Sequence, residues 1–124
     1  MTRGIRGATT AANTVEDITA ATQEMLKKMV EANGVSQEDI TAIFFTMTED
    51  LDAVYPAKAA RQAGYTDVPL MCYQELSIQN SLDFCIRALM LIQSSRSNRE
   101  IKHVYLKGAQ VLRPDLLEQG EKEK

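Results

Sequence analysis

The sequence predicts an α+β domain, in which a mixed sheet of about five strands packs against one long helix. Two observations carry this prediction. One segment has apolar residues at helical spacing between clear end signals, and several short runs are rich in β-branched, aromatic or alternating residues. The length of 124 residues fits one domain. We expect that domain to span residues 1–115, followed by a mobile charged tail over residues 116–124.

The long helix is predicted from Val15 onward, with Thr14 as its N-cap and Asp17 in a position similar to a capping box. Gly34 is the expected residue after its last turn. The apolar residues that recur at helical spacing are Ile18, Met25, Leu26, Met29 and Val30. A second, short helix is predicted over residues 56–63, because Pro56 suits a first turn and Gly64 follows the end.

The strands are predicted over residues 3–9, 40–47, 68–73, 82–93 and 101–112. Periodicity alone leaves residues 82–93 open between helix and strand. A strand is favoured there because the alternating segment 101–112 needs partners. Gly4 and Gly7 suggest close approach of another backbone or a ligand, Pro69 indicates an edge position, and Gly108 indicates a bulge or break.

Composition and charge exclude several classes of function. The net charge of -3 argues against broad nucleic-acid binding, and no apolar stretch approaches the length of a membrane span. The first residues lack the apolar core of a signal peptide, so we expect a cytoplasmic protein in which Cys72 and Cys85 stay reduced. His103 is the single histidine and is interpreted as structural. No Cys/His cluster indicates a metal site.

Arg87 stands in the most apolar run of the chain, residues 84–92. An arginine in such surroundings needs a partner, because a buried charge is costly unless it is paired. No acidic residue lies between Asp83 and Glu100, so a local ion pair is not expected. Either a distant carboxylate of the protein or a bound carboxylate or phosphate ligand then neutralises Arg87.

Further residues point to recognition of a small polar anion. Cations and hydrogen-bonding groups within apolar strands are Arg6, Arg87, Tyr105 and Arg113, with Cys72 and Glu75 at either side of a strand end. Lys58 and Arg61 share a face of the short helix. Each residue also has a structural interpretation: Tyr105 as a core tyrosine, Cys72 as a small buried residue and Glu75 as a solvated carboxylate. No nucleophile–base pair is recognisable.

Taken together, these residues resemble the trimeric, barrel-type monofunctional chorismate mutase family of bacteria. The resemblance extends from Arg3 to Asp115. It is carried by segments 3–10, 53–59, 72–75, 85–87 and 103–106 with 111–115. The family differs in fold from the all-helical chorismate mutases that catalyse the same reaction.

The resemblance implies a Claisen rearrangement of chorismate to prephenate without a metal or cofactor, in a homotrimer whose sheets form a pseudo-α/β barrel. It implies catalytic roles for Arg87, Glu75, Arg6 and Cys72. Substrate-binding roles are implied for Tyr105, Arg61, Lys58, Tyr55, Leu112 and Arg113. By the family pattern, Tyr55, Lys58 and Cys72 come from the subunit facing the one that supplies Arg6, Glu75, Arg87 and Tyr105.

Some positions depart from the family pattern. Tyr55 stands in place of phenylalanine, Met71 in place of a frequent threonine, and Tyr73 in place of a smaller apolar residue, and the loop around Gly64 is shorter. Because the charged residues are kept, we expect these changes to affect substrate affinity more than reaction type. Two alternatives stay open: a non-enzymatic trimeric binding module for an anionic metabolite, and a trimeric deaminase of enamines and imines on a similar fold.

Overall fold

The computed structural model describes residues 1–112, which contain a five-stranded sheet in the order β3–β2–β4–β1–β5. The strands are β1 (Thr2–Thr10), β2 (Ile40–Met47), β3 (Leu70–Gln74), β4 (Cys85–Gln93) and β5 (Val104–Tyr105). β4 pairs antiparallel with β1 and β2, whereas the edge strands β3 and β5 pair parallel with β2 and β1. The predicted mixed sheet of an α+β domain is confirmed.

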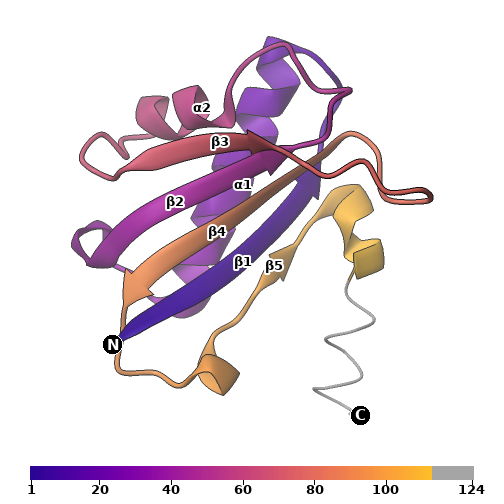
Figure 1. Ribbon diagram of the computed structural model, residues 1–124. Helices are drawn as coiled ribbons and strands as arrows, with labels where there is room; N and C mark the ends of the chain where they lie inside the picture. The colour runs from indigo at the N-terminus through magenta and orange to yellow at the C-terminus, as the bar shows by residue number, and fades with distance from the viewer. Residues whose placement is uncertain (113–124) are drawn as a thin grey trace.

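Both helices lie on one side of this sheet. α1 (Val15–Asn33) crosses behind the strands and α2 (Pro56–Gln62) lies beside β3 (Figure 1). Short 3-10 turns span Gln37–Asp39, Asn98–Glu100 and Lys107–Leu112. Neither α1 nor any other helix within residues 1–112 combines the length and the hydropathy that a membrane span requires.

The ends of α1 follow from its sequence signals. The Thr14 side chain accepts a hydrogen bond from the backbone N–H of Asp17, and Gly34 adopts the left-handed conformation at φ 60°. Asp17 does not complete the expected capping box. Its carboxylate instead accepts from the backbone N–H of Ala12 at 2.6 Å, which fastens the chain between β1 and α1.

The two faces of the sheet differ because side chains alternate along each strand. The face toward α1 is apolar and buried. Its core includes Ile5, Ile18, Met25, Leu26, Met29, Ile43, Phe45, Ile86, Met90 and Ile92. On β4, Arg87 and Leu89 point to the opposite face, which neither α1 nor α2 covers (Figure 1). This uncovered side, called the open face below, carries the site.

Gly7 is needed for α1 to approach β1 closely. A Cβ atom at Gly7 would lie 2.4 Å from Sδ of Met29 and 3.1 Å from Cγ of Met25. At Gly7 the atoms that approach closely are methionine side chains of α1, where the sequence suggested another backbone or a ligand. At Gly4 the nearest atom to an added Cβ is Cδ1 of Leu89, at 3.1 Å on the open face.

The prediction of a strand over residues 101–112 was wrong in extent. β5 contains only Val104–Tyr105, and a 3-10 turn occupies Lys107–Leu112. Lys107 adopts a positive φ of 51°, which ends the extended conformation, so the strand breaks just before Gly108. The backbone N–H of Gly108 then donates to Oγ1 of Thr10 at 3.1 Å, which holds the turn against β1.

Other predicted boundaries differ by two or three residues. β3 begins at Leu70 and not at residue 68, and β4 begins at Cys85 and not at residue 82. Phe84, immediately before β4, has a positive φ of 52° and therefore cannot continue a strand. The predicted tail over residues 116–124 lies outside the described residues.

Candidate active site

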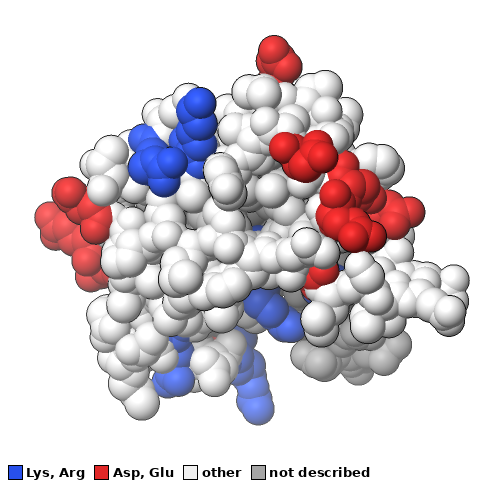
Figure 2. Space-filling model, turned by 45° about the horizontal axis from the view of Figure 1, so that its top comes forward, with Lys and Arg blue, Asp and Glu red and all other residues white. Residues whose placement is uncertain are grey.

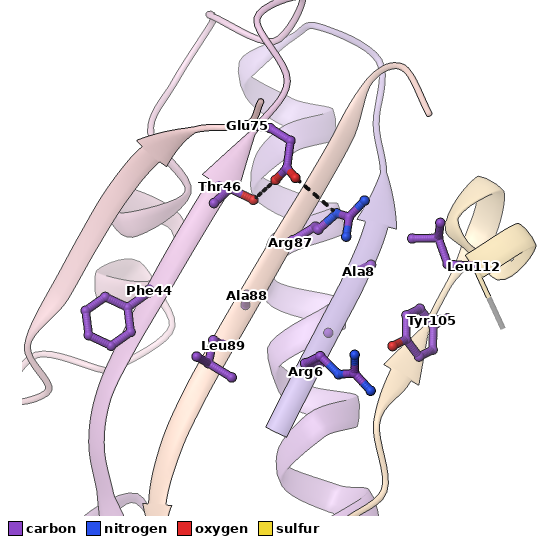
Figure 3. Close-up of a pocket in the computed structure, with 11 residues that line it drawn as sticks. Arg6, Ala8, Phe44, Thr46, Glu75, Arg87, Ala88, Leu89, Tyr105 and Leu112 are labelled. Atoms are coloured by element: carbon purple, nitrogen blue, oxygen red, sulfur yellow. Dashed lines mark hydrogen bonds and ion pairs between the residues drawn. The ribbon is translucent and has the colours of Figure 1, made fainter. Parts of the chain in front are cut away.

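The open face holds a pocket of about 610 Å³. Its lining residues come from β1, β2, β4 and β5, from the residue after β3 and from the turn Lys107–Leu112: Arg6, Gly7, Ala8, Phe44, Thr46, Glu75, Arg87, Ala88, Leu89, Tyr105 and Leu112. Figure 3 shows Arg6 and Tyr105 next to each other on β1 and β5, with Arg87 farther along the sheet. Two guanidinium groups and a phenol thus border one cavity, which suits an anionic ligand.

The strand register places small side chains on both sides of Arg87, which leaves space for the pocket. Arg87 pairs with Ala8 on β1 and with Thr46 on β2, so its neighbours across the sheet are small side chains. Its own side chain is 44 % exposed, because it points to the open face and away from the core. The apolar run around Arg87 therefore arises from the alternate positions that face α1, and the arginine itself is not buried.

Glu75 supplies a carboxylate of the protein itself, distant in sequence, as the partner of Arg87. This was one of the two partners expected for that charge, the other being a bound anion. The Oε2 atom of Glu75 lies 3.7 Å from Nε of Arg87, and its other oxygen accepts a hydrogen bond from the hydroxyl of Thr46. The backbone N–H of Glu75 donates to the carbonyl of Met47 at 2.8 Å, which continues the pairing beyond β3. In Figure 3 the terminal nitrogens of Arg87 lie on the side away from Glu75, toward β1.

Cys85 adjoins this pair. It is a free thiol, buried at the start of β4, and burial raises its pKa, with the charge and a hydrogen bond of Arg87 acting in the opposite direction. The thiol therefore stays neutral beside the guanidinium at neutral pH.

A second pocket of about 590 Å³ lies between the β2–α2 connection and β3. Tyr55, Lys58 and Cys72 all line it. Cys72 is a free, half-buried thiol whose pKa is raised by burial and partly lowered again by a backbone hydrogen bond from Ala57 and by the charge of Arg61. Figure 2 shows basic side chains gathered over α2, the helix that carries Lys58 and Arg61.

Three comparisons with known proteins agree with one another. Residues 2–116 match the family model described as chorismate mutase type I. The chain belongs to the chorismate mutase type I family. Chorismate mutase AroH of Bacillus subtilis (strain 168) is 44 % identical over 118 residues, covering 94 % of this chain and 93 % of that protein.

A second relative and a solved structure extend the agreement. Chorismate mutase AroH of Thermus thermophilus is 48 % identical over 118 residues, covering 94 % of this chain and 97 % of the relative. A solved chorismate mutase from Clostridium thermocellum superposes with a TM-score of 0.85 at 50 % identity, covering 87 % of this chain and 97 % of the other. The family inferred from the sequence motifs is confirmed. The matched residues, 2–116, also agree with the inferred range from Arg3 to Asp115.

This chorismate mutase-type fold divides most of the predicted site residues between the two pockets described above. The first brings together Arg87, Glu75, Arg6, Tyr105 and Leu112. The second brings together Tyr55, Lys58 and Cys72. Arg61 lines neither pocket, and Arg113 lies outside the described residues.

Sequence reasoning missed several residues that line the first pocket, including Thr46, Phe44 and Leu89. Phe44 and Thr46 alternate with the core residues Ile43 and Phe45, so their face could have been inferred from the strand period. Nothing in the sequence gives the register that sets Thr46 beside Arg87. Within residues 1–112, no group of three or more His, Cys, Asp or Glu side chains is arranged to hold a metal ion.

Proposed function

We propose that this chain catalyses the chorismate mutase reaction, the Claisen rearrangement of chorismate to prephenate. The observation that carries the proposal is its membership of the chorismate mutase type I family over residues 2–116. Relatives named chorismate mutase AroH, at 44 and 48 % identity, support it. The pocket chemistry agrees, because chorismate is a dicarboxylate and Arg6 and Arg87 border one cavity.

The reaction is intramolecular: an ether C–O bond breaks while a C–C bond forms, and no proton need be transferred. Catalysis then comes from holding the reactive conformer and from stabilising the negative charge that develops on the ether oxygen. Arg87 donates to that oxygen and to the side-chain carboxylate. Its contribution increases as the oxygen gains charge, which is the condition for raising the rate.

The other residues bind and orient the substrate. Arg6, aided by Tyr105, binds the side-chain carboxylate, and Glu75 with Cys72 contacts the ring hydroxyl. Lys58 and Arg61 lie near the ring carboxylate. Tyr55 and Leu112 form walls of the site, and Arg113 helps to close it. The ion pair with Glu75 orients the Arg87 side chain, and Thr46 in turn holds Glu75 by a hydrogen bond.

The active assembly is a homotrimer with its sites between subunits. Two features of the single chain support this. The open face exposes the large apolar side chains Met71 (53 %), Tyr73 (48 %) and Leu89 (40 %), and an apolar patch of this kind is typical of an interface. In addition, the proposed site residues are split between two pockets, so that a facing subunit can complete each site.

The assay that tests the proposal mixes the purified protein with chorismate and follows the loss of its ultraviolet absorbance. Acid then converts any prephenate to phenylpyruvate, which is measured separately. Fast loss with phenylpyruvate appearing supports the mutase. Loss at only the spontaneous rate, from a folded trimer, contradicts it and favours a binding module for an anionic metabolite.

A further inference from the structure

His103 contacts the candidate active site through the backbone. The peptide N–H of Arg6 donates a hydrogen bond to Nδ1 of His103 at 2.9 Å. Arg6 lies on β1, and His103 immediately precedes the two-residue strand β5. The imidazole therefore lies at the junction between two strands that both line the pocket, β1 with Arg6 among its residues and β5 with Tyr105.

The His103 side chain accepts the hydrogen bond that the backbone of β5 would accept from Arg6 if that strand were longer. β5 pairs parallel with β1 in the register Gly7–Val104 and Ala8–Tyr105, and the N–H of Leu106 donates to the carbonyl of Ala8 at 2.9 Å. Ala8 thus directs its backbone polar groups toward β5. Arg6, two residues earlier, directs its own to the same edge, where a carbonyl of the partner strand is the usual acceptor.

The carbonyl in question belongs to Lys102, and it already accepts a hydrogen bond from another residue. The carbonyl of Lys102 accepts from Nδ2 of Asn33 at 2.8 Å, and the N–H of Lys102 donates to Oδ1 of Asn33 at 2.8 Å. Asn33 is buried at the end of α1, and its Nδ2 also donates to the carbonyl of Met29. The backbone of residue 102 is therefore fixed to the helix, which leaves the imidazole of His103 to accept from Arg6.

We propose that His103 is a positioning residue for the chorismate mutase reaction: in its neutral form, with Nδ1 as acceptor, it keeps β5 in register with β1 and so fixes Arg6 and Tyr105 around the substrate carboxylate. The inference rests on the proposed function. His103 itself does not line the pocket. It acts through the backbone of Arg6 and through the strand that carries Tyr105.

The proton state of the imidazole decides whether the contact forms. With Nδ1 accepting, a neutral ring carries its proton on Nε2, whereas a doubly protonated ring has no acceptor for the Arg6 N–H. The charged side chain that acts on the ring is Arg6 of β1. α1 contributes the uncharged Asn33 to the neighbouring residue, and Lys102 precedes His103 in the chain. Burial, followed by the charge of Arg6, lowers the pKa of His103 from its ordinary value of 6.5.

Three variants separate positioning from bulk packing. His103→Asn carries an amide oxygen close to the location of Nδ1 and does not titrate, so it should keep the acceptor at every pH. His103→Gln carries its amide at the location of Nε2, and His103→Leu fills space without an acceptor. We expect kcat/KM for chorismate to fall roughly five- to tenfold in the Leu and Gln variants, mainly through KM, and by less than about twofold in the Asn variant.

The pH profile provides the decisive readout. The wild-type protein should lose kcat/KM as the pH falls below 6.5, because the protonated ring releases Arg6, and His103→Asn should lack this acid limb. An unchanged acid limb in His103→Asn would overturn the proposal. Equal kcat/KM for the Leu and Asn variants would also overturn it, since packing alone would then explain the residue.

A spectroscopic measurement keeps this test separate from the proposed function. Because His103 is the only histidine of the chain, its ring nitrogens are identified directly in long-range ¹H–¹⁵N NMR spectra of the protein without substrate. A proton on Nε2 at neutral pH supports the contact, and a proton on Nδ1 refutes it. Absence of turnover with the Nε2 tautomer present would contradict chorismate mutase activity and, with it, the positioning role in that reaction.

Discussion

The Arg87 guanidinium lies 3.7 Å from the Glu75 carboxylate, although Arg87 is on β4 and Glu75 follows β3, with β2 between the two strands. Thr46 of β2 spans the interval: it pairs with Arg87 across the sheet and donates its hydroxyl hydrogen bond to Glu75. Three neighbouring strands thus determine the orientation of one cation. The arrangement predicts that the shape of the Arg87 side chain matters as much as its charge.

Replacing Arg87 by lysine should reduce kcat/KM for chorismate by roughly 10²–10³, because a point charge cannot reproduce the planar fork that donates to two acceptors. Arg87→Ala should cost at least as much. Steady-state assays together with circular dichroism, to verify folding, provide the measurement. Near-normal turnover in Arg87→Lys would remove Arg87 from the proposed role at the ether oxygen.

Glu75→Gln distinguishes a catalyst from an anion receptor. The amide oxygen can still accept from Thr46, but the negative charge beside Arg87 is lost. For the mutase we expect kcat to fall by roughly tenfold or more, because the ring hydroxyl loses its charged acceptor. Calorimetric binding of prephenate provides the control. A variant that binds the anion more tightly with unchanged kcat would show that Glu75 has no part in the reaction.

Gly7→Ala should destabilise the protein by about 1–3 kcal/mol, because its Cβ would lie 2.4 Å from Sδ of the fully buried Met29. Gly4→Ala is the matched control on the same strand. Its Cβ would meet only side-chain tips, Cδ1 of the exposed Leu89 at 3.1 Å and Cδ2 of Leu91 at 3.8 Å, so the change should stay within about 0.5 kcal/mol. Urea unfolding at one fixed protein concentration measures both variants, and equal midpoints would contradict the packing argument.

The helix and most of the sheet could be predicted from local signals. Thr14 and Gly34 define the ends of α1, and β-branched and aromatic residues define β2. The extent of β5 could not be predicted, because it depends on the positive φ of Lys107 and on the contact of Gly108 with Thr10. The contact joins the turn to β1, and the alternating pattern of residues 101–112 contains no information about it.

For the candidate site as well, some residues could be predicted from the sequence and others could not. Arg87 stood out because a charge within an apolar run needs a partner, and the family motifs identified Glu75, Arg6 and Tyr105. The partner itself was beyond sequence reasoning, since the Arg87–Glu75 pair depends on strand order and register. The role of Thr46 was missed for the same reason.

Thr22→Val should stabilise the protein by about 1 kcal/mol. The hydroxyl of Thr22 is fully buried in α1, and no hydrogen-bond partner lies within reach among residues 1–112. Valine has a similar shape and removes the cost of burying an unpaired polar group. Thr22→Ala, which leaves a cavity as well, is the control and should be less stable than Thr22→Val. A loss of stability in Thr22→Val, measured by urea unfolding, would show that the hydroxyl has a partner in the assembled protein.

Subunits that are each defective in a different pocket should restore one another. Arg87→Ala damages the first pocket, and Lys58→Glu places a negative charge in the second, near the proposed ring carboxylate. If each site combines the first pocket of one subunit with the second pocket of its neighbour, co-refolding equal amounts should leave about one quarter of the sites intact. Activity should then recover to about one quarter of the wild-type rate, whereas each variant alone stays nearly inactive.

The control for this experiment co-refolds the wild-type chain with the double variant that carries both substitutions. Shared sites should again leave about one quarter of the sites active, whereas sites contained within one chain should leave about one half. Recovery in the first mixture requires that the two pockets come from different subunits. No recovery there, together with half activity in the control, would place the whole site within a single chain and contradict the proposed arrangement of subunits.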